Sequence, residues 1–166
     1  AAAEVLAPVV GRLQAVGDGA DIRVIVDYAH TPDALERAIR ALKETDNAGA
    51  LWVLFGCGGD RDPGKRAEMG AIACQFADRV IVTSDNPRSE APEAIIDDIL
   101  RGCDDSPIVE SDRAAAIALV IAEAKVGDIV LIAGKGHETY QEIDGVRLPF
   151  NDAEHAVQHL QQRQAA

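Results

Sequence analysis

The stretch directly after the apolar run at 80–82 places four chemically useful residue types in consecutive positions: Asp85, Asn86, Pro87 and Arg88. Aspartate, asparagine and proline are common where a strand enters a turn, for backbone reasons alone. The turn does not need the arginine. A guanidinium binds a carboxylate through two parallel hydrogen bonds, so this stretch is a candidate binding site for a carboxylate ligand.

Three more polar stretches follow apolar runs in the same way. They read DYAHTPD at 27–33, GCGGDRDPGKR at 56–66 and AGKGHE at 133–138. In an open α/β sheet, ligands collect at the carboxyl ends of the strands, so four polar strand ends predict one site on a shared rim. The alternative is a set of ordinary surface loops, which are polar by default.

The charges on this predicted rim complement an amino acid. Asp85 and Glu138 can accept hydrogen bonds from an ammonium group, and Arg61 and Arg88 can bind carboxylates. An amino acid with two zwitterionic ends is one such ligand. The alternative for the arginines is that they lie in solvent on tight turns.

The histidines give a weaker signal. His30 and His137 lie on the rim, either as acid–base groups or as polar residues without a chemical role. His155 and His159 lie on the last predicted helix, where we expect them to face solvent.

The stretch at 59–65 matches a phosphate-binding loop only in part. It reads G-x-x-x-x-G-K after a predicted strand, but Arg66 stands where magnesium binding needs serine or threonine. Pro63 also lacks an N–H that would face phosphate. Arg61 takes the third glycine position of a dinucleotide fingerprint. We therefore expect neither nucleotide motif here.

Short β-branched runs alternate with helical patterns along the chain. The predicted strands are 22–26, 51–55, 79–83, 107–110 and 128–133, and the predicted helices are 32–44, 64–77, 92–101, 112–125 and 152–163. This alternation predicts a Rossmann-like α/β fold, an open and mostly parallel sheet flanked by helices. Asp144 and Gly145, between Ile143 and Val146, predict a small β-hairpin on the edge of the sheet.

Length and composition fit a single domain of this kind. The chain has 166 residues, enough for one buried core, and 48% of them are apolar while only 4% are aromatic. A core of Ala, Val, Ile and Leu is typical of a parallel sheet covered by helices. Cys57, Cys74 and Cys103 are odd in number and widely spaced, which favours reduced thiols over disulfides or a metal site.

The acidic charge narrows the set of partners. A net charge of −12 argues against nucleic acid and against an anionic membrane, because neither attracts such a surface. No run approaches the roughly 18 apolar residues of a membrane span, and the first residues lack a signal-peptide pattern. We therefore expect a cytoplasmic protein that acts on small charged metabolites.

Five motifs together resemble a known family. They read DYAHTPDALERAI at 27–39, FGCGGDRDPGKRAEMGAIA at 55–73, ADRVIVTSDNPRSEAPEAIIDDI at 77–99, AGKGHETYQ at 133–141 and FNDAEHA at 150–156. In this order they resemble the C-terminal domain of the Mur ligases of peptidoglycan synthesis, and within that family the members that add meso-diaminopimelate. The resemblance runs from about residue 13 to the end of the chain.

The resemblance implies an ATP-dependent amide ligation. ATP phosphorylates the D-glutamyl carboxylate of UDP-N-acetylmuramoyl-L-alanyl-D-glutamate, and an amine of diaminopimelate attacks the acyl phosphate. The residues implied to bind diaminopimelate are Arg61, Asp85, Asn86, Pro87, Arg88, Gly134 and Glu138, and those implied to bind ATP are Arg12, Asp27 and His30. Arg88 is implied to hold the distal carboxylate, and Gly134 and Glu138 the distal ammonium. No catalytic residue and no metal ligand are implied, and Lys135 receives no role.

The resemblance also sets the expected domain content. Residues 1–166 would form the C-terminal domain alone, without the central ATPase and N-terminal UDP-binding domains that are its partners, and would be inactive by themselves. ATP and magnesium would belong to the full-length enzyme, and neither is expected to bind this domain alone. The alternatives are a freestanding amino-acid-binding module of the same fold, or a related amide ligase for another amino acid, such as a lysine-adding or folylpolyglutamate-type enzyme.

Overall fold

Six strands form one sheet in the computed structural model, which describes residues 11–45, 49–104 and 106–165. The strands are β1 (Gln14–Val16), β2 (Arg23–Asp27), β3 (Leu51–Phe55), β4 (Arg79–Val82), β5 (Ile108–Val109) and β6 (Ile129–Ala133). Their order across the sheet is β1-β2-β6-β3-β4-β5. All neighbours pair in parallel except β1, which runs antiparallel to β2.

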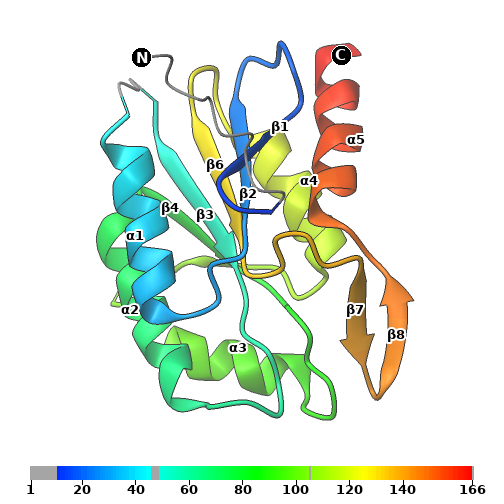
Figure 1. Ribbon diagram of the computed structural model, residues 1–166. Helices are drawn as coiled ribbons and strands as arrows, with labels where there is room; N and C mark the ends of the chain where they lie inside the picture. The colour runs from blue at the N-terminus through cyan, green and yellow to red at the C-terminus, as the bar shows by residue number, and fades with distance from the viewer. Residues whose placement is uncertain (1–10, 46–48, 105, 166) are drawn as a thin grey trace, which may run out of the picture.

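Helices cover both faces of this sheet (Figure 1). They are α1 (Pro32–Lys43), α2 (Gly64–Phe76), α3 (Pro92–Leu100), α4 (Arg113–Glu123) and α5 (Asp152–Ala165). The buried side chains divide into two clusters, one with α1, α2 and α3 and the other with α4 and α5. The sheet therefore has a separate apolar core on each face.

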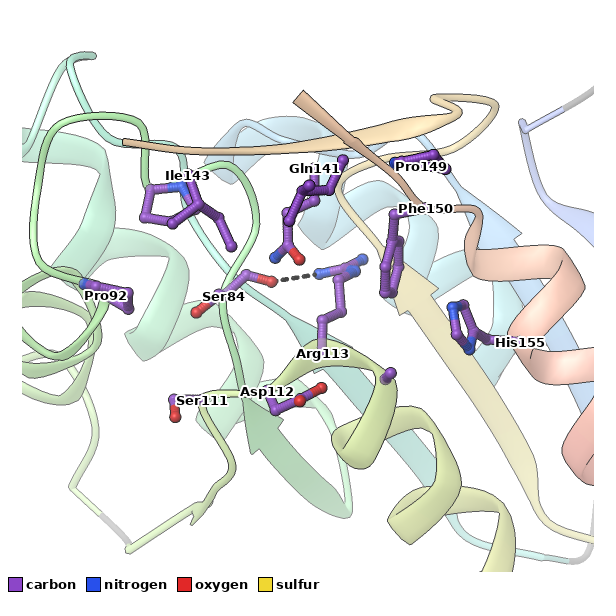
Figure 2. A pocket seen from close by; sticks show the side chains of 13 residues that line it. Ser84, Pro92, Ser111, Asp112, Arg113, Gln141, Ile143, Pro149, Phe150 and His155 are labelled. Atoms are coloured by element: carbon purple, nitrogen blue, oxygen red, sulfur yellow. Dashed lines mark hydrogen bonds between the residues drawn. The ribbon is translucent and has the colours of Figure 1, made fainter. Parts of the chain in front are cut away.

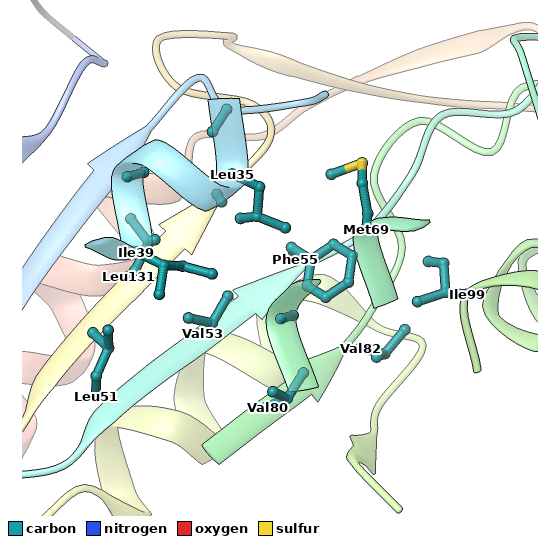
Figure 3. Packing of buried hydrophobic residues seen from close by; sticks show 14 of the residues in the cluster. Leu35, Ile39, Leu51, Val53, Phe55, Met69, Val80, Val82, Ile99 and Leu131 are labelled. Atoms are coloured by element: carbon teal, nitrogen blue, oxygen red, sulfur yellow. The ribbon is translucent and has the colours of Figure 1, made fainter. Parts of the chain in front are cut away.

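Alternate residues of the central strands supply the two cores. In β3, Leu51, Val53 and Phe55 pack with α1, α2 and α3, whereas Trp52 and Leu54 pack with α4 and α5. Figure 3 shows the first of these clusters, with side chains of β3 among those of the three helices. β3 and β6 are buried along their whole length, which is why they read as uninterrupted apolar runs.

The predicted α/β fold is confirmed. Each helix begins within one residue of its predicted start, and the five predicted strands all form part of the sheet. Two details differ. β1 is absent from the prediction because a three-residue edge strand with one buried side chain leaves no detectable pattern. β5 has two residues instead of the four predicted.

The predicted hairpin forms, but its expected position on the edge of the sheet is wrong. Its strands are β7 (Tyr140–Ile143) and β8 (Val146–Pro149), which make a separate two-stranded sheet. The turn residues Asp144 and Gly145 have φ angles of 49° and 75°, and Asp-Gly suits a turn that needs two positive values. The hairpin attaches to the loop after β4, because Arg88 N donates to Glu142 O (3.0 Å) and Asp144 N donates to Arg88 O (2.7 Å).

Asp128 joins three segments at the start of β6. Its carboxylate accepts hydrogen bonds from Ala50 N (2.8 Å), Lys125 N (2.9 Å) and Trp52 Nε1 (2.9 Å). Burial alone would raise the pKa of Asp128, but these hydrogen bonds and the Lys125 charge outweigh burial and hold the pKa below its usual value. The carboxylate therefore stabilises the fold in its ionised form.

We expect Asp128→Asn to lower the free energy of unfolding by about 1–3 kcal/mol at neutral pH, because the amide leaves buried donors unpaired. The folded pKa lies below the unfolded value of 3.8, so the wild-type chain has this contribution above that value and loses it as the pH falls through the folded pKa. Urea unfolding at neutral and acidic pH should show that the difference in free energy of unfolding between the wild type and Asp128→Asn becomes smaller on acidification. Asp97→Asn, at an exposed position of α3, is the control. A difference in free energy of unfolding that stays constant with pH would contradict this account.

Candidate functional site

The polar rim predicted from the sequence surrounds a cavity of about 470 Å³ where β2, β3, β4 and β6 end. Six of the seven residues predicted to hold diaminopimelate line it: Arg61, Asp85, Asn86, Arg88, Gly134 and Glu138. Pro87 lines a neighbouring cavity instead. Four loops that are far apart in the sequence thus meet at one site, because parallel strands end at the same side of a sheet.

A buried lysine lies beside the acidic residues of the cavity. Lys135 has no exposed surface, and its ammonium group lies 2.9 Å from Asn86 Oδ1, 3.0 Å from Glu138 Oε2 and 3.8 Å from Asp85 Oδ1. Asn86 Nδ2 also donates to Glu138 Oε2, at 3.0 Å. The two carboxylates that the sequence assigns to a ligand ammonium therefore already share one internal cation.

Asp85 has a buried carboxylate with room for a further partner. Its side chain is 11% exposed, and no donor in the described part of the chain makes a hydrogen bond to its carboxylate oxygens. Burial raises the pKa of Asp85, and the charges of Arg113 and Lys135 oppose this rise. The φ of Gly134 is 117°, and a Cβ there would lie 2.6 Å from Asp85 Oδ2. Only glycine therefore leaves this carboxylate accessible.

Arg88 is held from two sides and keeps part of its guanidinium for a ligand. Its φ is 53°, a left-handed conformation unusual for arginine, which the backbone bonds to the hairpin maintain. Nη1 donates to Gly59 O at 2.7 Å, and Nε lies 3.8 Å from Glu142 Oε2. Nη2 has no partner among the described residues. This edge of the guanidinium can bind a carboxylate in the cavity.

Asn86 and Arg61 differ in what they can offer a ligand. Asn86 already uses Oδ1 to accept two hydrogen bonds and Nδ2 to donate one, so a single N–H remains. Arg61 is exposed, and only its Nη1 is engaged, with Asp60 O at 3.1 Å. Asn86 therefore mainly builds the site, whereas Arg61 keeps most of its donors.

The loop that matches a phosphate-binding motif in part does not present Arg66 to a ligand. Arg66 is 2% exposed and donates to Glu90 at 2.8 and 2.9 Å and to Asp98 at 3.0 Å. These bonds fix the start of α2 against α3 and the loop before it. The side chain at the position of the magnesium-binding hydroxyl thus has a structural role here.

The residues assigned to ATP lie on the rim around the end of β2. Both Asp27 carboxylate oxygens accept backbone N–H groups at 2.7 Å, one from Leu13 and one from Ala29. Arg12 is exposed next to Leu13, and His30 lines the cavity. The Arg12 guanidinium and the Asp27 carboxylate could each contact a polar group of a nucleotide. No three His, Cys, Asp or Glu side chains of the described ranges gather as metal ligands.

Similarity to known proteins identifies the family. A sequence profile described as "Mur ligase, glutamate ligase domain" matches residues 11–136. The chain belongs to this family. The resemblance inferred from the five motifs is therefore confirmed.

Two curated relatives share more than half of their aligned residues with this Mur ligase domain. The UDP-N-acetylmuramoyl-L-alanyl-D-glutamate–2,6-diaminopimelate ligase of Chromobacterium violaceum is 58% identical over 147 residues, which are 87% of this chain and 30% of that protein. The ligase of the same name from Pseudomonas aeruginosa is 57% identical over 153 residues, which are 91% of this chain and 31% of that protein. The chain thus spans about a third of the length of these relatives.

A solved structure of a ligase with the same name shares the fold. The TM-score is 0.88 at 46% identity, and the alignment covers 96% of this chain and 33% of that one. Because nearly the whole chain aligns, the Mur ligase fold includes the part after residue 136. In the described ranges of this Mur ligase domain, no helix combines the length and apolar character needed to cross a membrane.

A buried ion pair supports the site of this Mur ligase domain, and the sequence analysis missed it. Arg113, at the start of α4, donates two hydrogen bonds of 2.8 Å to Asp152, at the start of α5. Its other donors reach Ser84 O at 3.1 Å and Ala133 O at 3.0 Å, the carbonyls directly before two residues of the cavity. Figure 2 shows the bond to Ser84. The partners are 39 residues apart, and no sequence signal links them.

His155 also departs from the sequence prediction. Its ring stacks on Phe150, with centroids 4.5 Å apart, and lines a second cavity of about 490 Å³ beside the hairpin (Figure 2). His159 is half-buried and contacts Gln162 at 3.0 Å. Neither histidine lines the candidate site.

Proposed function

We propose that this chain is the amino-acid-binding domain of a ligase that joins meso-2,6-diaminopimelate to UDP-N-acetylmuramoyl-L-alanyl-D-glutamate. One observation carries the proposal: two guanidiniums, of Arg61 and Arg88, and two carboxylates, of Asp85 and Glu138, line a single cavity. Such a cavity complements one zwitterionic end of an amino acid. The names of the curated relatives support the same substrate pair.

The contacts of the cavity suggest how diaminopimelate binds. Its distal carboxylate would bind the free edge of the Arg88 guanidinium and would also contact the exposed Arg61. Its distal ammonium would meet Glu138 and Asp85, in the space that Gly134 leaves open. The opposite end of the ligand, with the second amine, would then project from the rim toward the rest of the enzyme.

The chemistry of ligation would require parts that the described residues do not supply. In the complete enzyme, bound ATP provides the phosphoryl group that activates the D-glutamyl carboxylate. The residues of this chain bind and orient the attacking amino acid, and fixing its distal end raises the effective concentration of the reacting amine. Arg12, Asp27 and His30 would contact the nucleotide. We expect the isolated chain not to turn over ATP.

The site should discriminate strongly against lysine. Lysine matches the distal ammonium of diaminopimelate but lacks the carboxylate, so its binding would leave Arg88 without a partner in the cavity. Sites that are built to pair a polar group reject analogues that lack this group by about 10⁴-fold or more. The proposal therefore predicts a substrate preference, not only a substrate.

A chimeric ligase tests the proposal. In it, this chain replaces the matched segment of the Chromobacterium violaceum ligase, and kcat/KM is measured with meso-diaminopimelate and with L-lysine. We expect ligation of diaminopimelate with a preference of about 10⁴ over lysine. The parent ligase is the control.

Two results would overturn this assignment. Equal use of lysine would indicate a related amide ligase with a different substrate. A chimeric ligase without activity, combined with calorimetric binding of an amino acid to the isolated chain, would indicate a freestanding binding module.

A further inference from the structure

The buried ammonium of Lys135 explains the charge of the acidic end of the cavity. Asp85 and Glu138 both line this end, and Lys135 lies against both without reaching the surface. Two carboxylates and one ammonium have a net charge of −1, which matches one ligand ammonium. Without Lys135, the buried carboxylate of Asp85 and the partly exposed carboxylate of Glu138 would share this end of the cavity with no ammonium between them.

The hydrogen bonds of Lys135 also fix the orientation of its neighbours. Glu138 Oε2 accepts from Lys135 Nζ and from Asn86 Nδ2, both at 3.0 Å. Glu138 Oε1 has no hydrogen bond among the described residues, so it is the oxygen left for a ligand. Lys135 also donates to Asn86 Oδ1, which Glu142 N holds from the hairpin side at 2.9 Å. The lysine therefore connects the loops after β4 and β6.

The chemistry of lysine suits this position. A compact ammonium has three donors: two of them reach oxygens of Asn86 and Glu138, and the Asp85 carboxylate lies 3.8 Å away. The Tyr140 ring lies 5.7 Å from the ammonium and adds a favourable cation–π contact. Lys135 has no exposed surface and its ammonium is held by Asn86 and Glu138, so it is placed to act through these neighbours and not as a base for the substrate amine.

We propose that Lys135 is a positioning residue: it orients Glu138 and Asn86 and neutralises one of the two cavity carboxylates, so that the site accepts one ligand ammonium. This inference rests on the proposed function, because it concerns the ammonium end of the same cavity. It assigns a specificity role to a residue that never touches the substrate.

The test compares two amino acids that differ only at this end. 2-Aminopimelate has the carbon chain, both carboxylates and one amine of diaminopimelate, but lacks the second amine. In the chimeric ligase with the wild-type chain, we expect kcat/KM for diaminopimelate to exceed that for 2-aminopimelate by about tenfold or more.

Lys135→Met should remove most of this preference. We expect kcat/KM for diaminopimelate to fall about 10- to 100-fold, mainly through KM, while the value for 2-aminopimelate changes less than about threefold. The KM for ATP should not change. Lys125→Met, at an exposed position, is the matched control. Equal losses for both amino acids would show that Lys135 only supports the fold, and no loss for either would also overturn the proposal.

A measurement on the unmodified chain covers the case in which the variant does not fold. A buried ammonium exchanges its protons slowly, so the Nζ signal of Lys135 can be followed by ¹⁵N NMR during titration. Diaminopimelate should shift this signal clearly more than 2-aminopimelate does, and identical responses would contradict the proposal. A wild-type chimeric ligase that ligates neither compound, combined with calorimetric binding of an amino acid to the isolated chain, would instead contradict the proposed function, and the role of Lys135 would fall with it.

Discussion

Arg88→Ala is expected to lower kcat/KM of the chimeric ligase for meso-diaminopimelate by roughly 30- to 5,000-fold. Removing one partner of a desolvated, hydrogen-bonded charge pair costs about 2–5 kcal/mol, because the other charge stays buried without compensation. Here the unpaired group would be the distal carboxylate of the ligand. Activity with lysine should change much less, since lysine has no carboxylate at this end. The preference of about 10⁴ over lysine should therefore fall by about the same factor as kcat/KM for diaminopimelate.

Two further variants separate charge from geometry. Arg88→Lys keeps the positive charge but loses the planar fork, and Lys cannot replace both hydrogen bonds, so we expect an intermediate loss. Arg37→Ala removes an arginine that pairs with the exposed Asp33, and its kinetics should match those of the wild type. A preference over lysine that survives Arg88→Ala would refute the role given to this residue.

Asp152→Ala is expected to lower the free energy of unfolding by about 3–5 kcal/mol, the largest effect on stability among the variants considered. Arg113 and Asp152 have no exposed side-chain surface, and the substitution leaves the guanidinium charge buried without its partner. Arg113 also supports the carbonyls of Ser84 and Ala133, so the loops of the cavity should loosen as well. Urea unfolding of the 166-residue chain measures the change.

A second aspartate–arginine pair on α5 provides the control. Arg163 donates to both carboxylate oxygens of Asp21, at 2.8 and 2.9 Å, but this pair is partly exposed. Asp21→Ala should therefore cost far less than Asp152→Ala, because water replaces the lost partner. The double variant Arg113→Met/Asp152→Leu should recover part of the stability, since it leaves no buried charge unpaired, although the carbonyls of Ser84 and Ala133 lose their donor. Similar losses for Asp21→Ala and Asp152→Ala would contradict burial as the cause.

On its own, the sequence determined the features of the fold that depend on local patterns, namely the buried strands, the helix starts and the polar loops. The runs LWVLF and IVLIA are apolar at every position because both faces of β3 and β6 are covered. Such uninterrupted apolar runs can be recognised in the sequence without a structure. Helix starts were equally local, as with the Thr31 side chain that caps α1. Because ligands collect at the carboxyl ends of parallel strands, the polar loops were predicted to share one rim. Six of the seven residues that the resemblance implied for diaminopimelate line one cavity there.

The tertiary structure alone decided what each of these residues does in the cavity. Lys135 and Asn86 are 49 residues apart, and Arg113 and Asp152 are 39 residues apart, so no local pattern records either contact. The same holds for the hairpin, whose turn was readable but whose attachment to Arg88 was not. The physical reason is that a charged side chain is buried only where partners from other segments surround it, and these partners are set by strand order. The sequence thus identifies the polar side chains of the site. The packing around the sheet determines which of them are used in internal contacts and which remain free to bind a ligand.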